Sequence, residues 1–509
     1  MATEIITLDM NRVEGDLEIR LQVTDQVVED AWCIGTMYRG FEQLLKGRAA
    51  RDGIVITPRV CGICGTAHQY SAVVALETAF SLEVAPNGTR IRNLCSLAEE
   101  TQSDMRHSFL MFTVDFCNQR YAADPLYPQL VEMFEPFKGR IHRETIEQTK
   151  EIVKVVALFG GQWPHSTFMV PGGVVSVPDA SRVINALAIV DSYQRWYERS
   201  ILGCSVERWQ QNRSTEELFA WLDEDAAHRD SAMGTFMRFG RQIGLQRAGQ
   251  GNGNLLSFGS CFDPEAWQPP YDQHVGFRAA GFHNAETGQV ERLDYALVAE
   301  HVRHSHFRDY DGGRHPYEGE TVPDFLPDSD KYSWAKAPRY GGKVVEAGPL
   351  ADQVCAADPL ICALFQQEGS NSWLRQFTRI HRPSQSLPFM RQILTELLKH
   401  ARAPYVINHE VPHDHARGLG AVQAARGGLA HWVEFDKGKI ERYQIITPTA
   451  WNASPRDSAG VRGHWEESVI GTVIDDLENP VELGHIIRSH DACLVCTVHL
   501  LGHGPKYRY

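Results

Sequence analysis

The sequence has no apolar run long enough to cross a membrane and no start that resembles a secretion signal. No eighteen consecutive residues are apolar. Residues 1–12 carry two acidic side chains and one basic one, without the basic start and apolar middle of a signal peptide. We therefore predict no direct transmembrane segment. The expected location is cytoplasmic, or peripheral on the cytoplasmic membrane through partners.

An excess of positive charge is also missing. The 509 residues include 50 Lys and Arg against 64 Asp and Glu, which gives a formal net charge of −14. Such a chain repels phosphate backbones, so we predict no nucleic-acid partner. Hydrophobic residues make up 43 % and charged residues 22 %, as in ordinary globular proteins, which argues against disordered, collagen-like and coiled-coil classes.

Cysteine is sparse and shows no disulfide framework. The eleven cysteines are an odd number spread through a large chain, whereas disulfide scaffolds are short and cysteine-dense. Four of the cysteines form two Cys-x-x-Cys pairs. The other seven stand alone, and we interpret them as small buried hydrophobic residues: Cys33, Cys95, Cys117, Cys204, Cys261, Cys355 and Cys362.

Hydrophobic periodicity predicts an α+β fold. Asp16 to Val23 alternates polar and apolar residues, as a half-buried antiparallel strand does, and Gln26 to Gly35 is its expected hairpin partner. A second hairpin is predicted at Trp432 to Thr447, turning at Asp436-Lys437-Gly438. A loop-rich, partly β insertion is expected over residues 249–348. Long helices are predicted to form a large core with these hairpins at its periphery, at Arg90 to Cys117, Arg143 to Phe159, Ala180 to Leu202 and Pro388 to Ala401.

The two cysteine pairs lie at opposite ends of the chain. Cys61-Gly62-Ile63-Cys64 is followed by His68, and Cys493-Leu494-Val495-Cys496 is followed by His499. Two such turns can present four sulfur atoms to one soft metal ion. Structural zinc normally uses pairs within a few tens of residues, and a redox Cys-x-x-Cys would leave the second pair unexplained. Spacing alone leaves a catalytic metal site, structural zinc and a redox motif open.

The residues around the pairs resemble a known family. Arg-x-Cys-Gly-x-Cys-x-x-x-His and Asp-x-Cys-x-x-Cys-x-x-His resemble the paired signature of nickel–iron hydrogenase large subunits, most like the cyanobacterial-type uptake and H2-sensing group. The resemblance covers essentially the whole chain. It implies one large-subunit domain over residues 1–499 and a short extension over 500–509, whose cleavage on maturation it leaves open. Further blocks match in order, at Arg12 to Leu17, Arg39 to Glu42, Gly160 to His165, Arg426 to Leu429 and Pro448 to Asn452.

This resemblance implies a Ni–Fe centre on the four cysteines. Cys61 and Cys493 would be terminal ligands of nickel, and Cys64 and Cys496 would bridge nickel to iron. The iron would carry CO and cyanide. Thiolates suit this task because they are soft, strong donors.

The resemblance also assigns catalytic roles. Glu14 matches the proton-relay glutamate, Arg426 the arginine over the metal centre, and Asp491 the carboxylate that orients this arginine. Without the family, Glu14 would be interpreted as a solvated glutamate and Arg426 as a surface arginine. Here Gln423-Ala424-Ala425 precedes Arg426, where the family usually has Glu-Ala-Pro, so the polar lining of the site is in doubt.

Further residues are implied beside the centre and at a second metal site. His68 matches a histidine near a bridging cysteine, and a family position that is often aspartate falls on Ser103, with Asp104 adjacent. A buried magnesium-type ion would be bound by Glu42, His499 and the backbone carbonyl of Ile445, with waters completing its oxygen-rich shell. A salt-bridged glutamate and a structural histidine are the plainer interpretations of Glu42 and His68.

The implied function is the heterolytic oxidation of H2, with electrons passed to a separate iron–sulfur small subunit, because no further cysteine run here could hold a cluster. Nickel-insertion and maturation proteins are implied partners, and a higher oligomer is possible. The alternative is an H2-sensing regulatory subunit, which a retained 500–509 segment would suit. The related quinone-module subunit of respiratory complex I lacks the four cysteines, and a structural zinc protein is a further alternative.

Overall fold

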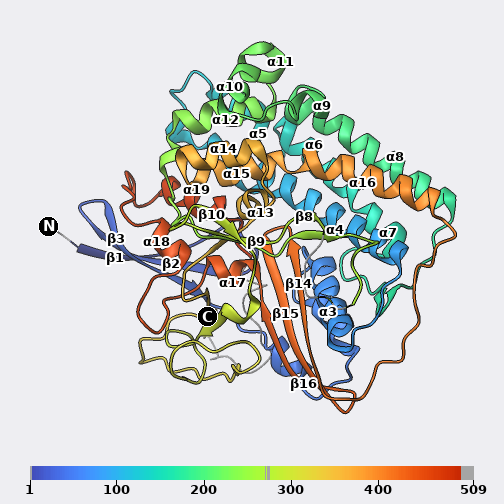
Figure 1. The fold of residues 1–509 in the computed structure, drawn as a ribbon. Helices are drawn as coiled ribbons and strands as arrows, with labels where there is room; N and C mark the ends of the chain where they lie inside the picture. The colour runs from blue at the N-terminus through green and yellow to red at the C-terminus, as the bar shows by residue number, and fades with distance from the viewer. Residues whose placement is uncertain (1–2, 270, 272–275, 494–509) are drawn as a thin grey trace.

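The computed structural model describes residues 3–269, 271 and 276–493. Figure 1 shows a large helical body, with the sheet β14-β15-β16 running beneath it and the sheet β1-β2-β3 to one side, near the N-terminus. The predicted α+β class, with a large helical core and peripheral antiparallel hairpins, is confirmed. Within the described part of the chain, no helix is both long and apolar enough to span a bilayer.

Four long helices make the centre of the body: α4 (Pro86–Arg106), α6 (Arg140–Ile152), α8 (Ala180–Trp196) and α16 (Pro383–Lys399). Helix α4 packs against α6 and α16, and α8 packs against α6 and α16. Although α4 is buried along most of its length, it carries several charged residues. Arg92 on α4 pairs with Glu77 at 2.7 Å, and both side chains are 0 % exposed. Such pairing is required because an unpaired buried charge is strongly destabilising.

The predicted helix from Arg90 to Cys117 is wrong in its second half. The α-helix ends at Arg106, a π-helical turn covers His107–Phe112, and a 3-10 turn covers Thr113–Cys117. The π turn begins at His107, whose ring contacts Asp491. Periodicity does not reveal such a turn, because it changes the hydrogen-bond register without changing the apolar character of the residues.

The other helix predictions are right in type and differ at their ends. The predicted helix from Arg143 to Phe159 is two helices, α6 and α7 (Lys154–Gly160), separated at Val153. The helix predicted from Pro388 to Ala401 is α16, which begins at Pro383, so Pro388 lies inside it. The predicted helix from Ala180 ends as α-helix at Trp196 and continues as a π turn over Tyr197–Leu202.

The central sheet comprises β14 (Ala416–Ala424), β15 (Gly427–Asp436) and β16 (Lys439–Ile446). The predicted hairpin turn is confirmed between β15 and β16, where Lys437 and Gly438 have φ of 49° and 73°. Helix α3 (Gly65–Phe80) packs closely on β14. The approach requires glycine, because a Cβ at Gly418 or Gly420 would lie 1.8 Å from a backbone oxygen of α3.

The N-terminal sheet packs against two helices from the last part of the described residues. Strands β1 (Thr3–Asp9), β2 (Leu17–Thr24) and β3 (Val27–Gly35) pair antiparallel, as predicted for the last two. The buried face of β2 packs in one apolar cluster with residues of α18 (His464–Ser468) and α19 (Val481–Ser489). The segment that leads to the second cysteine pair is therefore anchored on the N-terminal sheet.

Residues 249–348 form the predicted loop-rich, partly β region. Its strands are two to four residues long and belong to small sheets, in the orders β10-β9-β6-β13, β11-β12 and β7-β8. Their bounds are β6 Leu255–Ser257, β7 Ser260–Phe262, β8 Gly276–Arg278, β9 Gly281–Asn284, β10 Gln289–Glu291, β11 Val298–His301, β12 Ala337–Tyr340 and β13 Glu346–Ala347.

Shorter elements complete the fold. Two strands pair as a small hairpin, β4 (Met169–Val170) and β5 (Gly173–Val174). The remaining α-helices are α1 Phe41–Leu45, α2 Asp52–Ile56, α5 Tyr127–Phe134, α9 Val206–Trp209, α10 Thr215–Glu224, α11 Ala226–Arg229, α12 Ala232–Gln242, α13 Pro349–Cys355, α14 Pro359–Glu368, α15 Ser372–His381 and α17 Pro448–Asn452.

Candidate metal centre

The first cysteine pair lies in a buried turn before α3. A 3-10 turn (Thr57–Arg59) leads into Cys61, and Cys64 is the N-cap residue of α3. The two cysteines are 1 % and 5 % exposed. Arg39 fixes the turn from outside, since its guanidinium donates to the carbonyls of Val60 at 2.6 Å and Arg59 at 2.9 Å.

Cys493, the described member of the second pair, contacts the N-terminal segment and lies beside the first pair. Cys493 is fully buried, and its backbone N–H donates to Thr449 Oγ1 at 3.1 Å. Glu14 forms a parallel bridge with Cys493, with its N–H donating to the carbonyl of Ala492 at 3.1 Å. The predicted ligands Cys496 and His499 lie outside the described residues.

The Sγ atoms of Cys61 and Cys493 are 3.7 Å apart, although the residues are 432 positions apart in sequence. None of the ten described cysteines forms a disulfide with another described cysteine. Two thiolates bound to one ion at about 2.3 Å in tetrahedral geometry have sulfur atoms about 3.8 Å apart. The thiol pair therefore has the separation of two ligands of one metal ion, and its soft donors suit nickel and iron.

A buried ion-pair group faces the thiols. Arg426 lies in the turn between β14 and β15, is 7 % exposed, and pairs through Nε with Asp491 Oδ1 at 2.9 Å. Burial opposes its charge, but Asp491 and the thiols of Cys493, Cys61 and Cys64 outweigh burial and raise the pKa of Arg426. A fixed positive charge therefore lies beside the sulfur atoms.

Asp491 connects this arginine to two residues that sequence reasoning missed. His107 Nδ1 is 3.0 Å from Asp491 Oδ1, and Arg379 Nε on α15 is 3.9 Å from Oδ2. Burial alone would raise the pKa of Asp491, yet Arg426, His107 and Arg379 lower it below its usual range. Asp491 is thus a permanent carboxylate. The spacing of four between Ser103 and His107 was a usable signal, because it places both on one helix face.

Glu14 differs from Asp491 in its electrostatics. Its pKa is raised by burial and by the nearby Cys61 and Asp491 side chains, against the opposing effect of Arg426. The side chain is half-buried rather than enclosed. Glu14 therefore combines a raised pKa, adjacency to Cys493 and partial access to solvent.

His68 belongs to a chain of buried polar groups. Its Nδ1 is 3.1 Å from His431 Nε2, and His431 Nδ1 is 2.8 Å from Tyr443 Oη. Burial lowers the pKa of His68 to about 4, against the effect of Cys61, so the ring is neutral. Its Nε2 has no hydrogen-bond partner among the described residues. Sequence reasoning did not identify His431 or Tyr443.

The structure separates Ser103 from Asp104. Asp104 binds Arg382 through two contacts, at 2.6 Å and 2.9 Å, whereas the buried Ser103 hydroxyl has no partner within the described residues. Arg382 also donates to the carbonyl of Ala425 at 2.6 Å, directly before Arg426. Asp104 therefore supports the Arg426 loop through Arg382.

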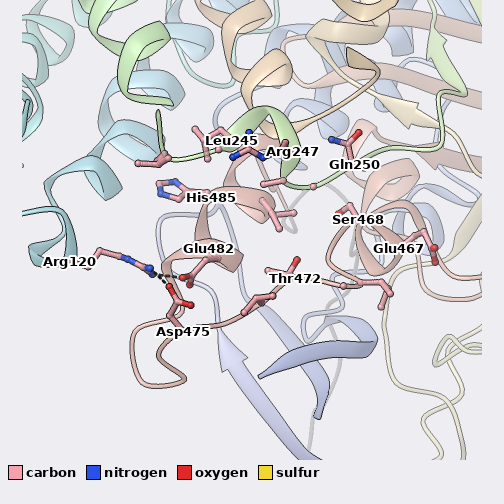
Figure 2. A pocket seen from close by; sticks show the side chains of 18 of the residues that line it. Arg120, Leu245, Arg247, Gln250, Glu467, Ser468, Thr472, Asp475, Glu482 and His485 are labelled. Atoms are coloured by element: carbon pink, nitrogen blue, oxygen red, sulfur yellow. Dashed lines mark hydrogen bonds and ion pairs between the residues drawn. The ribbon is translucent and has the colours of Figure 1, made fainter. Parts of the chain in front are cut away.

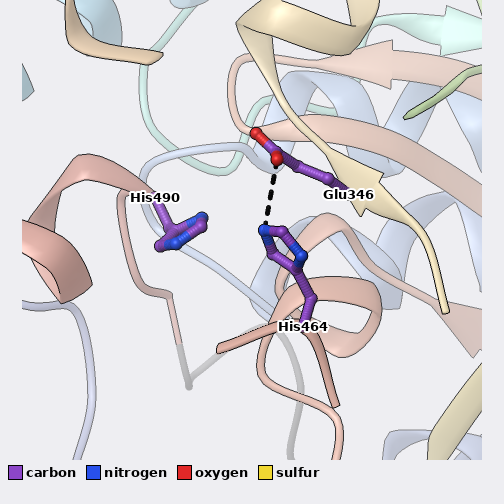
Figure 3. Close-up of side chains that lie close together, drawn as sticks. All are labelled: Glu346, His464 and His490. Atoms are coloured by element: carbon purple, nitrogen blue, oxygen red, sulfur yellow. Dashed lines mark ion pairs between the residues drawn. The ribbon is translucent and has the colours of Figure 1, made fainter. Parts of the chain in front are cut away.

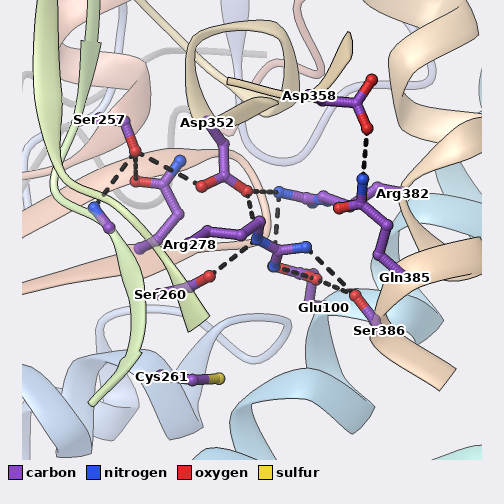
Figure 4. A network of polar contacts seen from close by, with 12 residues as sticks. Glu100, Ser257, Ser260, Cys261, Arg278, Asp352, Asp358, Arg382, Gln385 and Ser386 are labelled. Atoms are coloured by element: carbon purple, nitrogen blue, oxygen red, sulfur yellow. Dashed lines mark hydrogen bonds and ion pairs between the residues drawn. The ribbon is translucent and has the colours of Figure 1, made fainter. Parts of the chain in front are cut away.

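Figure 4 shows the polar network that supports this loop. Arg278 pairs with Glu100 at 2.6 Å and Asp352 at 2.9 Å, and Arg382 contacts both carboxylates at 3.4 Å. Gln423, which replaces the usual family glutamate, accepts hydrogen bonds at 3.3 Å from the Ser257 hydroxyl and the Phe258 N–H. The neutral substitution at position 423 is thus accommodated next to Asp352.

Glu42 lies in a separate buried polar group. Its Oε1 accepts from the Ile445 N–H at 2.9 Å and is 3.5 Å from Lys336 Nζ. Lys336 also pairs with Glu300 at 2.8 Å. Burial and the neighbouring Glu42 raise the pKa of Glu300 to about 7, against the effect of Lys336. Two carboxylates face one ammonium here, so the oxygen-rich group suits a further cation.

A large cavity lies elsewhere. Figure 2 shows it beside α19, with a volume of about 730 Å³ and walls that include Leu245, Gly249 and His485. Its charged residue Arg120 already pairs with Asp475 at 2.5 Å, and also with Glu482. None of the predicted site residues lines this cavity, so the candidate centre is the enclosed thiol site.

The comparisons with known proteins define the class. A sequence profile described as nickel-dependent hydrogenase matches residues 39–127 and 234–499. The periplasmic [NiFeSe] hydrogenase large subunit of Desulfomicrobium baculatum is 32 % identical, over 97 % of this chain and 95 % of that protein. The uptake hydrogenase large subunit of Rhizobium leguminosarum bv. viciae is 26 % identical, over 98 % and 95 %. These relatives are oxidoreductases that act on H2.

A solved structure agrees with the sequence matches. The reduced Ni-Fe-Se hydrogenase from D. vulgaris Hildenborough superimposes with a TM-score of 0.81 at 28 % identity, covering 98 % of this chain and 100 % of that one. The chain belongs to the nickel-dependent hydrogenase family, as the catalytic large subunit of a nickel–iron hydrogenase. The family implies a Ni–Fe centre, and a large subunit implies a small-subunit partner. One relative is named periplasmic, so the cytoplasmic location stays a prediction.

Proposed function

We propose that this chain oxidises H2 to protons and electrons, at a Ni–Fe centre held by Cys61, Cys64, Cys493 and Cys496. The observation that supports this most directly is the 3.7 Å separation of the Cys61 and Cys493 sulfur atoms. Arg426, whose charge interacts with both thiols, adjoins this pair. Sulfur donors and a fixed guanidinium together suit a redox metal centre better than a structural zinc site.

A bound Ni–Fe centre, with CO and cyanide on the iron, would supply the binding and heterolytic cleavage of H2 and take up its two electrons. Cys61 and Cys493 would be the terminal nickel ligands, and Cys64 and Cys496 the bridging ones. Arg426 would hold a positive charge toward the thiols, kept in place by Asp491 at 2.9 Å. A preoriented charge of this kind stabilises developing negative charge without reorganisation.

Glu14 would carry the proton away. It is bridged to Cys493 through the backbone, its carboxyl group interacts with Cys61, and it is half-buried. Burial moves its pKa upward, toward the pH at which a group both accepts and releases protons. Asp491 is unsuited to the task, because its pKa is lowered and it stays ionised.

The Glu42 group would hold the predicted magnesium-type ion, with Glu42, the Ile445 carbonyl and His499 as protein ligands. Two carboxyl groups, Glu42 and Glu300, beside the single ammonium of Lys336 support a cation there. Because His499 follows the second cysteine pair, the ion would tie the end of the chain to α1. Nickel-insertion and maturation proteins would load the main centre, and a small subunit with iron–sulfur clusters would accept electrons. A higher oligomer stays a prediction.

The test is an infrared spectrum of the protein purified with its small subunit, together with H2 oxidation by an artificial electron acceptor. We expect metal–CO and metal–cyanide bands that shift under H2, and steady turnover. A folded, nickel-loaded sample without such bands would overturn the proposal. Shifting bands with only slow turnover would identify the H2-sensing alternative instead.

A further inference from the structure

Three side chains of metal-ligand type, from different parts of the chain, lie close together next to the segment that carries Asp491. Glu346 comes from β13, His464 begins α18, and His490 follows α19. One ligand atom from each lies within 4.8 Å of the other two, and the residues are 2 %, 2 % and 4 % exposed. Figure 3 shows the two imidazole rings and the carboxylate directed at a common space. Glu346, His464 and His490 are called the Glu–His–His triad below.

His490 is the member that no hydrogen bond within the described residues accounts for. Neither of its ring nitrogens has a hydrogen-bond partner among the described residues. The ring centroids of His464 and Trp465 lie 4.9 Å and 5.5 Å from that of His490. Neither ring forms a hydrogen bond with His490 among the described residues. A buried polar group without a partner is destabilising, so a ligand would stabilise this ring.

The protonation state favours coordination. Burial lowers the pKa of His464, against the effect of Glu346, and burial with the positive charge of Arg375 lowers that of His490 further. Both rings are therefore neutral in the folded protein. A neutral imidazole offers a free nitrogen lone pair, which is the form that binds a metal ion.

Arg375 gives the plainest competing explanation. Its Nε donates to Glu346 Oε1 at 2.8 Å, its Nη2 donates to Oε2 at 3.1 Å, and Nη2 is 3.4 Å from His464 Nε2. The Ser370 hydroxyl also donates to Oε2. The ion pair with Arg375 gives the Glu346 carboxylate its hydrogen-bond donors. His464 Nε2 is also paired, because it lies 3.2 Å from Glu346 Oε2. These contacts leave His490 unexplained, and hydrogen bonds of this kind also orient carboxylates that bind metals.

We propose that the Glu–His–His triad is a second metal site, which binds one divalent transition-metal ion of the zinc or ferrous class. Two imidazole nitrogens with one carboxylate oxygen match the preferences of such ions. Magnesium and calcium fit poorly, because they require more oxygen ligands and Arg375 already offsets the carboxylate charge. The site is separate from the cysteine centre and from the Glu42 group, and its existence does not depend on the proposed function.

An ion bound here would stabilise the segments that position Arg426. His490 directly precedes Asp491, which pairs with Arg426. Gly348, which follows β13, lies next to the Arg426 loop: a Cβ atom added to Gly348 would be 3.9 Å from the Arg426 carbonyl oxygen. One ion would thus join β13, α18 and the segment before Asp491. The ion would hold the carboxylate that positions Arg426, without touching the substrate.

The test locates the ion directly. Crystals of the complete large–small complex, grown with one equivalent of zinc sulfate per chain, are measured just above and just below the zinc absorption edge. We expect an anomalous peak between the two rings and Glu346, which disappears below the zinc edge. A second pair of measurements, just above and just below the iron edge, tests whether iron was bound during expression. Water density without a peak at either edge, or zinc there only at millimolar concentration, would overturn the proposal.

Variants give the matching stoichiometry. We expect His490→Asn and His464→Asn to lose about one equivalent of zinc or iron per chain, measured by plasma mass spectrometry, and to keep their nickel. His228→Asn is the control, since His228 is also buried and its ring Nδ1 bonds the Trp221 carbonyl, at 2.8 Å. Unchanged zinc and iron in both triad variants would refute the site. If neither variant folds, the wild-type edge measurement decides alone.

Discussion

Two buried groups of charged residues lie next to each other and differ in how completely the protein satisfies them. In the network of Arg278 and Arg382, each guanidinium nitrogen has an acceptor within 3.4 Å, supplied by Glu100, Asp104, Asp352 and neighbouring oxygens (Figure 4). In the group of Arg426 and Asp491, Arg426 Nη1, His107 Nε2 and Ser103 Oγ have no hydrogen-bond partner among the described residues.

This difference indicates that the Arg278–Arg382 network supports the fold, whereas the Arg426–Asp491 group takes part in chemistry. A closed network gains its energy from its own pairs, and removing one partner leaves a buried unpaired charge. A group with open donors is costly unless something outside the chain completes it. Two of these open groups lie where this chain is expected to hold metal ions: Arg426 Nη1 beside the cysteine thiols, and the ring of His490 in the Glu–His–His triad.

The largest effect on activity is expected at the thiols. Cys61→Ser should abolish nickel binding and H2 oxidation, because a hydroxyl is a hard, weakly acidic ligand in place of a soft thiolate. Nickel per chain and turnover would be measured together. Cys95→Ser is the matched control, since Cys95 is also fully buried but lies within α4. Full nickel content in the Cys61 variant would remove Cys61 from the ligand set.

Arg426→Lys is expected to lower turnover about 100- to 1,000-fold, as losing one preoriented donor does in other active sites. Lysine keeps the charge but not the planar fork, so nickel content should be retained. The control Arg456→Lys changes an arginine that pairs with Asp30 at 2.5 Å, away from the thiols. Equal turnover in the two variants would contradict a special role for Arg426.

Glu14→Gln is expected to slow turnover about 100-fold by removing the proton acceptor. In the wild type, the raised pKa of Glu14 means that its carboxylate form is lost as pH falls through a value above 4.5. Activity should therefore fall on the acid side in the wild type, and this pH dependence should be absent in the variant. Glu18→Gln is the control, because burial also raises its pKa but no cysteine contributes to that shift. An unchanged acid limb in Glu14→Gln would exclude this relay.

The smallest effect on activity is expected in the closed network. Arg278→Gln should destabilise the fold by about 3–5 kcal/mol, because it leaves Glu100 and Asp352 short of a partner. Turnover per nickel-loaded molecule should stay unchanged, measured beside a thermal unfolding curve. A loss of turnover comparable to that of Arg426→Lys, at unchanged stability, would show that the two groups act as one.

Sequence reasoning predicted the fold class and both hairpins because they depend on local patterns. The alternation over Asp16 to Val23 and the Asp436-Lys437-Gly438 turn each express a rule that acts over a few residues. The π turns after Arg106 and Trp196 were missed, since a shift of hydrogen-bond register leaves apolar spacing almost unchanged.

The site could be predicted only as far as motifs reach. The cysteines, Arg426 and Asp491 lie in matched blocks, and the structure brings Cys61, Cys493, Arg426 and Asp491 together. His107, Arg379 and His431 lie outside those blocks, and their roles depend on which distant elements pack on one another. The roles of Glu42, Ile445 and Ser103 stay predictions, as do those of Cys496 and His499 beyond the described residues.

The bridge between Glu14 and Cys493 also sets an order of events during biosynthesis. A ribosome that has produced Cys61 and Cys64 must add over 400 further residues before Cys493 emerges. Until then the nascent chain would offer only two of the four sulfur atoms of the proposed centre, and a site with two thiolates would hold a metal ion more weakly. We therefore expect metal loading after translation, when Cys493 packs against the N-terminal segment.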